Sequence, residues 1–488
     1  MRTRLDLPVD RRLLLPISLP LSRHILRLMT VLAWTLTLHP DFSQAQDSLP
    51  PQPQYKGEFK RDSHGDITIA PAAEKSAGDE LGPQGRVIRV GPTHRFQTIA
   101  GAAAAARSGD VVEIEAGDYA GDVAVWDQYK LTIRAVGGRA RLTAQGKSAE
   151  DKAIWVIRGG DFKIENIEFN GARSSSKNGA GIRLERGKLS VRRCAFFNNE
   201  DGILTGDNAG ALEILDSEFG FNGAGDGLSH AIYTGHIPRL TVTGSYFHHA
   251  REGHLIKSRA AESRIYYNRI TDEPGGRASY EIDLPNGGLA YVVGNIAQQS
   301  AGSTNGHLIS FGVEGYVGKT HQLFLSFNTL VNSLPGRGEF LLIKPGKFKL
   351  YAANNVLVGV GGIDLAGQKT ALQTPWHGND RLGEFLAEDN AQALLLNNNV
   401  LLHGQDFSDA GAFDFRPRPS PRAPLGVANL EPGDDMPVVP EREYVHPAHS
   451  RPLLGKPTLP GAFQLSGDTP PSGRAVPAAT APSAPGSP

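Results

Sequence analysis

The chain has 488 residues with 57 glycines and 33 prolines, a composition rich in turn formers that argues against a compact helical protein. Fifty basic and 51 acidic residues leave a formal net charge of -1, so the chain lacks the positive charge of a general nucleic-acid binder. Cys194 is the only cysteine, which excludes an internal disulfide and any metal site built from several cysteines.

The first 45 residues have the pattern of a signal peptide. Basic residues precede an apolar run from Leu28 to Leu38, and small residues at Ser43 and Ala45 fit a cleavage site. We expect cleavage after Ala45, a periplasmic or secreted protein, and no stable membrane insertion after cleavage; retention of the segment as an anchor stays open. Residues 46–85 are polar and rich in proline, which predicts a linker.

Short strand-like phrases recur through the middle of the chain, mostly at intervals of roughly 23 to 33 residues. A unit of this size cannot bury a core alone, so successive units must stack and pair strand with strand. The repeat therefore predicts a solenoid of strands. An asparagine opens many of the phrases, and we expect these side chains to form a hydrogen-bonded ladder along the stack, among them Asn268, Asn295, Asn328, Asn355 and Asn399.

The segment before the repeats resembles the amino-terminal cap of right-handed parallel β-helix proteins of the pectate-lyase-like superfamily. The resemblance lies in residues 96–99, the alanine-rich stretch 102–106, and residues 108–112 and 116–119. It implies an all-β fold, a right-handed parallel β-helix over residues 86–402 with a short N-terminal capping helix. We expect residues 403–465 to pack on the β-helix in extended form and residues 466–488 to be a disordered tail rich in Pro, Ala and Ser.

Aligning the repeats by an inward aliphatic residue predicts which polar side chains face outward together. The chosen register stacks six isoleucines inside: Ile182, Ile203, Ile232, Ile256, Ile282 and Ile309. The next position then places Tyr233, Lys257 and Asp283 in one row, about 4.8 Å apart from coil to coil. Arg259 and Glu281 lie two residues from members of this row, which predicts one exposed face that carries all five side chains.

A second column lies two residues before the inward isoleucine of each coil. It contains three histidines and a tyrosine: His230, His254, Tyr280 and His307. A structural ladder held by neighbouring backbone and a catalytic role are both open for these histidines. A solvated ion-pair ladder is likewise open for Lys257 with Asp283 and Glu281.

The segment from Glu252 to Arg259 is similar to the Lys-Ser region of the chondroitinase B and alginate lyase family. The resemblance implies that Lys257 acts as a base, and that Glu252 matches one of the acidic residues that hold calcium in the family. The sequence departs from the family where an arginine is expected one coil later, since Asp283 to Asn286 stand there, and the second upstream acid is Ala250. Arg259 is the available substitute.

These residues suit β-elimination at a uronate, which needs a base, a cation beside the carboxylate and an acid at the leaving oxygen. We expect Lys257, its pKa lowered by Arg259, to be the base, with His254 or His230 as the alternative. Tyr233 or Tyr280 would donate the proton, and Arg259 with His254 would neutralise the carboxylate. His230, Glu281, Asp283 and His307 are candidate substrate-binding residues.

The predicted function is thus a polysaccharide lyase-like enzyme that acts, as a monomer, on an acidic polysaccharide. No cofactor is required by the sequence, and calcium is possible at Glu252. A non-catalytic carbohydrate-binding or cell-envelope protein is the alternative, because the fold alone does not confer function. A uronan C5-epimerase or a glycoside hydrolase on the same fold also stays open.

Overall fold

The computed structural model describes residues 59–61, 67–69, 85–366, 386–387, 390–412, 414–418, 426–428, 430 and 438–464. The chain divides into two compact units, Met1–Lys75 and Ser76–Pro488. In the first unit, β1 (Phe59–Arg61) and β2 (Ile67–Ile69) form an antiparallel pair. The predicted signal peptide, most of the predicted linker and the predicted tail beyond residue 465 lie outside the described residues. Among the helices of the described segments, none has the length and hydropathy of a membrane span.

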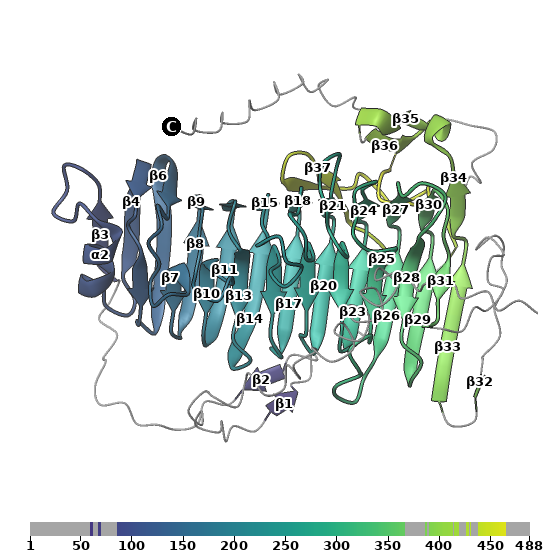
Figure 1. Ribbon diagram of the computed structural model, residues 1–488, viewed down its shortest axis with the longest axis horizontal. Coiled ribbons are helices and arrows are strands. Elements are labelled where there is room, and N and C mark those ends of the chain that lie inside the picture. The colour runs from purple at the N-terminus through teal and green to yellow at the C-terminus, as the bar shows by residue number, and fades with distance from the viewer. Residues whose placement is uncertain are drawn as a thin grey trace, which may run out of the picture. The chain divides into compact units, whose positions relative to one another are not determined.

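The second unit is the predicted parallel β-helix, with three strands in a typical coil (Figure 1). Face 1 is a ten-stranded parallel sheet. Its strands are β5 (Ala124–Trp126), β7 (Ala153–Ile157), β10 (Ala180–Leu184), β13 (Asp201–Thr205), β16 (Ile232–Thr234), β19 (Ile256–Ser258), β22 (Ile282–Leu284), β25 (His307–Phe311), β28 (Glu339–Ile343) and β31 (Ile363–Asp364).

Faces 2 and 3 belong to one larger sheet, in which β6 pairs with strands of both faces. Face 2 contains β3 (Val87–Val90), β4 (Val111–Ala120), β6 (Lys130–Thr143), β8 (Asp161–Glu165), β11 (Gly187–Arg192), β14 (Ala209–Leu215), β17 (Arg239–Thr243), β20 (Glu262–Tyr266), β23 (Leu289–Val293), β26 (Gln322–Ser326), β29 (Phe348–Ala353) and β33 (Asn390–Asn397). Face 3 contains β9 (Ile167–Asn170), β12 (Ala195–Phe197), β15 (Glu218–Gly220), β18 (Tyr246–His248), β21 (Arg269–Thr271), β24 (Ile296–Gln299), β27 (Thr329–Asn332), β30 (Val356–Val358) and β34 (Val400–Leu402).

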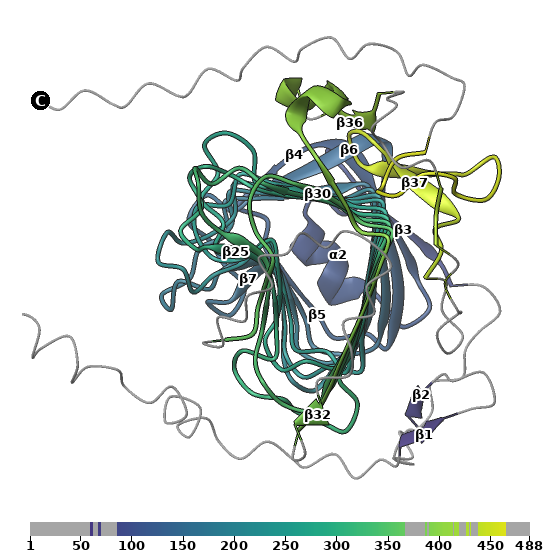
Figure 2. The same ribbon diagram turned by 90° about the vertical axis from the view of Figure 1, so that its right-hand side faces the viewer.

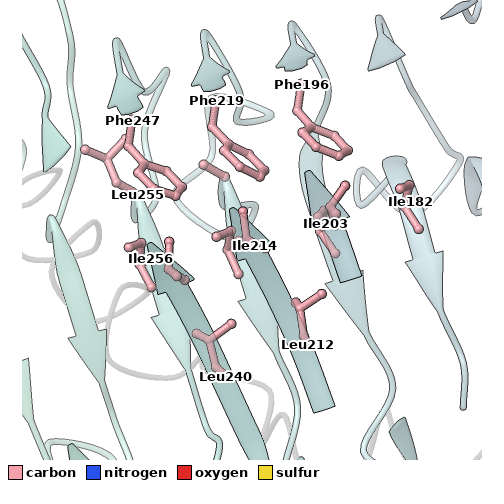
Figure 3. Packing of buried hydrophobic residues seen from close by; sticks show 14 of the residues in the cluster. Ile182, Phe196, Ile203, Leu212, Ile214, Phe219, Leu240, Phe247, Leu255 and Ile256 are labelled. Atoms are coloured by element: carbon pink, nitrogen blue, oxygen red, sulfur yellow. The ribbon is translucent and has the colours of Figure 1, made fainter. Parts of the chain in front are cut away.

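The strands of face 3 are the recurring phrases of the sequence, so the repeat is confirmed. Each pairs in parallel with the same phrase in the next coil, for example Phe219 with Phe247. The phenylalanines of neighbouring phrases stack inside the coils, with ring centroids of Phe196 and Phe219 4.6 Å apart and those of Phe219 and Phe247 4.8 Å apart. Figure 3 shows this column of rings beside the inward isoleucines. Stacked phenylalanines thus fill this part of the core, and aliphatic side chains occupy the same position in the coils that follow, such as Ile270 and Leu330.

The predicted asparagine ladder is confirmed, and it extends further than predicted. From Cys194 to Asn355, the backbone N–H at each ladder position donates to the side chain at the same position of the next coil. The residue before each ladder position has a positive φ, as at Tyr267 (54°) and Phe327 (53°), which turns the chain sharply between faces 2 and 3. The ladder residues are Cys194, Ser217, Ser245, Asn268, Asn295, Asn328, Asn355 and Asn399.

The capping helix is confirmed as α2 (Ile99–Ala105), which begins after Thr98, whose hydroxyl accepts from the N–H of Gly101. Ile99 and Ala102 of this helix belong to the main core cluster. Figure 2 shows α2 lying across the open end of the coils. A solenoid end would otherwise expose the apolar interior of its first coil, so this short helix is needed there.

The chain after face 3 returns along the outside of the solenoid. It includes η1 (Gly404–Asp406), β35 (Phe407–Asp409), η2 (Ala410–Ala412), β36 (Asp414–Pro417), β37 (Arg442–Val445) and β38 (His449–Pro452). The strands β35 and β36 form an antiparallel pair, and so do β37 and β38. Earlier in the chain, β32 (Leu386–Ala387) pairs antiparallel with β33. The N–H of Ala462 donates to Thr329 Oγ1, and Ser326 Oγ donates to the carbonyl of Val438. These contacts lie on faces 2 and 3 and leave face 1 to the site described next.

Candidate active site on face 1

The predicted register of face 1 is correct at every coil from Ile182 to Ile309. Tyr233 pairs with Lys257, and Lys257 pairs with Asp283, on the adjacent strands β16, β19 and β22. Lys257 Nζ lies 3.2 Å from Asp283 Oδ2, so the predicted row makes a direct ion pair. The three side chains meet because each occupies the same outward position of its coil.

Arg259 joins this row from the end of β19. Its Nε donates to the hydroxyl oxygen of Tyr233 at 3.1 Å, and its Nη1 donates to Asn286 Oδ1 at 2.6 Å. Lys257 Nζ and Arg259 Cζ each lie 5.7 Å from the centroid of the Tyr233 ring, a cation–π arrangement. Asn286 was not predicted as a site residue, and the sequence gives no signal that its side chain orients a guanidinium.

Glu314 completes the cluster and was not predicted. Its Oε1 accepts from Lys257 Nζ at 2.8 Å, and its Oε2 accepts from Arg259 Nη2 at 2.5 Å. It comes from the loop after β25, where the sequence has no strand periodicity to place it. We name Tyr233, Lys257, Arg259, Asp283 and Glu314 the face 1 cluster.

The face 1 cluster is less exposed than predicted. The side chain of Lys257 is 10% exposed and that of Asp283 is 2% exposed, whereas that of Glu314 is 42% exposed. The loop that carries Glu314 covers the row, since its backbone bonds to the turn that follows β22 at Pro285 and Asn286. The charged row therefore lies under a loop rather than on an open sheet.

The prediction that the pKa of Lys257 is lowered is wrong. Burial lowers this pKa, but the carboxylates of Asp283 and Glu314 outweigh burial and the charge of Arg259, so the pKa is raised. Lys257 is consequently an ammonium at neutral pH. The pKa of Glu314 responds in the opposite direction: burial raises it, and the two cations lower it overall.

The second predicted column forms a ladder next to the cluster. The N–H of His254 donates to His230 Nδ1 at 3.0 Å, and the N–H of Tyr280 donates to His254 Nδ1 at 3.2 Å. The two imidazole rings stack with centroids 4.5 Å apart. Below them, Asp201 Oδ1 accepts from the N–H of His230 at 2.6 Å.

This ladder fixes the protonation of both histidines. Burial lowers the pKa of His254 to about 4 and that of His230 well below its usual value, so both rings are neutral at neutral pH. Because Nδ1 accepts a hydrogen bond in each ring, the ring proton resides on Nε2. His254 Nε2 lies 3.4 Å from Asp283 Oδ2, to which it presents this proton. In this arrangement the two histidines are donors and do not have the free lone pair of a base.

The remaining predicted residues lie around this centre. His307 occupies the next position of the ladder column, with Nε2 3.0 Å from Asp364 Oδ2 and Nδ1 3.1 Å from Asn305 Oδ1. The Glu252 carboxylate pairs with Arg277 at 2.7 Å. Within the described part of the chain, no group of three or more histidine, cysteine or acidic side chains has the geometry to hold a metal ion.

Glu281 is the one predicted binding residue that the structure removes from the face. It is fully buried, and among the residues that the structure describes neither of its carboxylate oxygens has a hydrogen-bond partner. The equivalent residues in the adjacent coils are Leu255 and Leu308, which belong to the hydrophobic core, and Figure 3 shows Leu255 beside Phe247. Strict alternation along the strand misplaces this position, because the chain bends into the interior just before the inward isoleucine.

Comparison of the sequence with known protein families and with curated proteins finds no match. A search of solved structures finds the PL6 family alginate lyase AlyGC, at 14% identity and a TM-score of 0.28, over 73% of this chain and 49% of that chain. A variant of AlyGC with an arginine changed to alanine has 17% identity, the same coverage and a TM-score of 0.25. This chain spans about half the length of these structures.

Proposed function

We propose that this protein is a polysaccharide lyase-like enzyme that cleaves an acidic, uronate-containing polysaccharide by β-elimination. The observation that carries the proposal is the convergence of Lys257 and Arg259 on the hydroxyl and ring of Tyr233. This places two cations and a proton donor at one point of face 1. A uronate lyase needs those groups at its reacting sugar.

The roles follow from the contacts. Arg259, oriented by Tyr233 and Asn286, neutralises the uronate carboxylate. Lys257, as the free amine, takes the proton beside that carboxylate. The electron pair of the broken C–H bond forms the new double bond, and the glycosidic C–O bond breaks. The leaving oxygen takes a proton from Tyr233, whose oxygen already accepts from Arg259 and whose O–H is therefore free to donate.

His254 supports the base rather than replacing it. It shares Asp283 with Lys257, because both lie within 3.4 Å of Oδ2. Asp283 thereby orients the Lys257 side chain. Tyr280, half-buried and next to His254 in the ladder, is the alternative proton donor.

The cellular setting is part of the same proposal. A signal peptide on residues 1–45 would send the chain to the periplasm or outside the cell, where acidic polysaccharides are found, and we propose a monomer. Calcium remains a candidate cofactor on the sequence resemblance alone. Glu252, the residue expected to hold it, has its carboxylate on Arg277.

One observation favours a second function. Lys257 is held as an ammonium between Asp283 and Glu314, the state that binds a carboxylate and cannot accept a proton. A non-catalytic protein that binds acidic polysaccharide would have the same cluster. The two functions differ in whether Lys257 loses its proton when the polymer is bound.

The deciding experiment follows ultraviolet absorbance while the protein is incubated with a panel of uronate polysaccharides, with calcium or with a chelator. A rising signal from unsaturated uronate establishes the lyase and its polymer. The chelator arm tests calcium. Absorbance that stays flat across the panel, together with retardation of the protein in gels that contain the polymer, establishes the binding protein instead.

A further inference from the structure

We propose that Glu314 occupies the position of a ligand carboxylate, and that the site binds a uronate by exchanging Glu314 for the carboxylate of the sugar. This rests on the proposed function for the identity of the sugar, and goes beyond it in assigning the position and in making Glu314 a competitor of the ligand. The ligand class is a sugar acid whose two carboxylate oxygens bridge Lys257 and Arg259.

The contacts of the Glu314 carboxylate show which kind of ligand Lys257 and Arg259 can bind together. One carboxylate divides its oxygens between them, with Oε1 2.8 Å from Lys257 Nζ and Oε2 2.5 Å from Arg259 Nη2. Both are short hydrogen bonds between a cation and a carboxylate. A uronate carboxylate has the same charge and the same spacing between its oxygens, so it can make both contacts at once.

Of the two carboxylates in the cluster, only Glu314 can leave. Asp283 accepts from Ser310 Oγ, lies beside His254 and Lys257, and is 2% exposed. The Glu314 side chain is 42% exposed, and within the described part of the chain its carboxylate contacts Lys257 and Arg259. The fixed carboxylate belongs to the site, whereas the exposed one sits where an incoming anion would arrive.

The loop keeps its place without the carboxylate. The N–H of Glu314 donates to the carbonyl of Pro285 at 3.0 Å, and the N–H of Val317 donates to the carbonyl of Asn286 at 3.0 Å. The Tyr316 hydroxyl donates to the carbonyl of Lys344 at 2.6 Å. Rotation of one side chain can therefore open the site while the backbone on both sides of it stays bonded.

The cations also stay oriented after the exchange. Arg259 keeps Tyr233 and Asn286 as partners for Nε and Nη1, which leaves Nη2 for the ligand. Lys257 keeps Asp283. The exchange replaces one carboxylate with another between Lys257 and Arg259, so the charge in contact with these two cations does not change on binding. Binding to the wild-type protein is therefore weakened by competition from Glu314.

The test is calorimetric titration of wild type and Glu314→Gln with galacturonate, glucuronate and mannuronate, and with the neutral sugar galactose. Glu314→Gln removes a charge-assisted competitor, so we expect at least one uronate to bind about tenfold more tightly, with galactose unaffected. Glu185→Gln is the matched control. Glu185 likewise bridges a lysine and an arginine, Lys152 and Arg183, beside face 1, and its loss should leave uronate affinity unchanged.

Equal or weaker uronate binding by Glu314→Gln, with an unchanged melting temperature, would overturn the inference. If the variant melts early, Glu314→Asp replaces it, because the shorter side chain keeps the charge but cannot span both cations; it too should bind more tightly. A separate assay of uronate cleavage by the wild-type protein tests the proposed lyase function. Tighter binding without cleavage by wild type keeps this inference and rejects the lyase, whereas cleavage without tighter binding does the opposite.

Discussion

The protonation of Lys257 controls the proposed chemistry at the scale of the single residue. An ammonium between two carboxylates is well placed to bind an anion and poorly placed to accept a proton. The same residue can act as a base only after it loses its proton. Its raised pKa therefore predicts how activity depends on pH.

We expect kcat/KM for uronate cleavage to rise with pH on the alkaline side, because the free enzyme must deprotonate Lys257 and the pKa of this group lies above its usual value. Lys257→Arg keeps the positive charge beside Asp283 but does not deprotonate, so it should retain the melting temperature and lose turnover at every pH. The measurements are unsaturated uronate by absorbance and thermal melting. Residual cleavage above a few per cent of wild type would remove Lys257 as the base.

Glu281 leads to a prediction about the pH dependence of stability rather than of activity. Burial, and then the charge of Asp272, raise its pKa well above the usual value, so folding favours the protonated acid. The folded state binds more protons than the unfolded state above the usual glutamate pKa. Stability is therefore greatest below that pKa and falls as pH rises toward the folded value.

Glu281→Leu should stabilise the protein by about 1–3 kcal/mol at neutral pH, because it replaces two unpartnered oxygens with the side chain found at Leu255 and Leu308. The free energy of unfolding is measured in urea at several pH values. Glu281→Gln is the control that removes only the titration. A destabilised Glu281→Leu would show that the carboxyl has a partner in solution.

At the scale of the element, the asparagine ladder stabilises the turn between faces 2 and 3. The Asn295 amide donates to the carbonyl of Ile265 at 2.8 Å and to Asn328 Oδ1 at 3.1 Å, and its oxygen accepts from the N–H of Asn268 at 2.9 Å. Each turn thus depends on its neighbours on both sides.

Asn295→Ala should destabilise the protein by about 2–4 kcal/mol, since it leaves buried donors and acceptors without partners in three coils. Asn295→Ser should cost less, because serine fills the same position at Ser217 and Ser245 and accepts the neighbouring N–H through its hydroxyl. The comparison is made by urea unfolding of the two variants. Equal losses would mean that the amide matters only through its volume.

The parts of the site on regular elements could be predicted, and the parts on loops could not. The inward isoleucines set the register, and the register alone brings Tyr233, Lys257 and Asp283 together. Glu314 lies in an irregular loop, so no periodicity connects it to Lys257. The direction of the Lys257 pKa was mispredicted because Asp283 was not weighed against Arg259 and the second carboxylate, Glu314, was unknown. Glu281 was misplaced at a bend, where alternation between faces no longer holds.

At the scale of the whole solenoid, the site and the cap are far apart in the stack. The cap α2 contacts β3 and β5, whereas the face 1 cluster lies on β16, β19 and β22 and on the loop after β25. Each coil forms hydrogen bonds with the coils on either side of it. The free energy of unfolding is therefore approximately a sum of the stabilities of the single coils and of the interfaces between adjacent coils. Damage at the cap should therefore spread only as far as the nearest coils.

Ile99→Asp tests this locality, because Ile99 is the fully buried first residue of the cap α2 and a carboxylate there would replace its apolar contacts with a buried charge. We expect faster amide hydrogen exchange in β3 to β7, and little change in β16 to β25 or in any uronate cleavage or binding at face 1. Ala100→Asp, on the exposed side of the same helix, is the matched control. Loss of protection along the entire solenoid would instead show that the coils unfold as one cooperative unit, with the cap as its closing element.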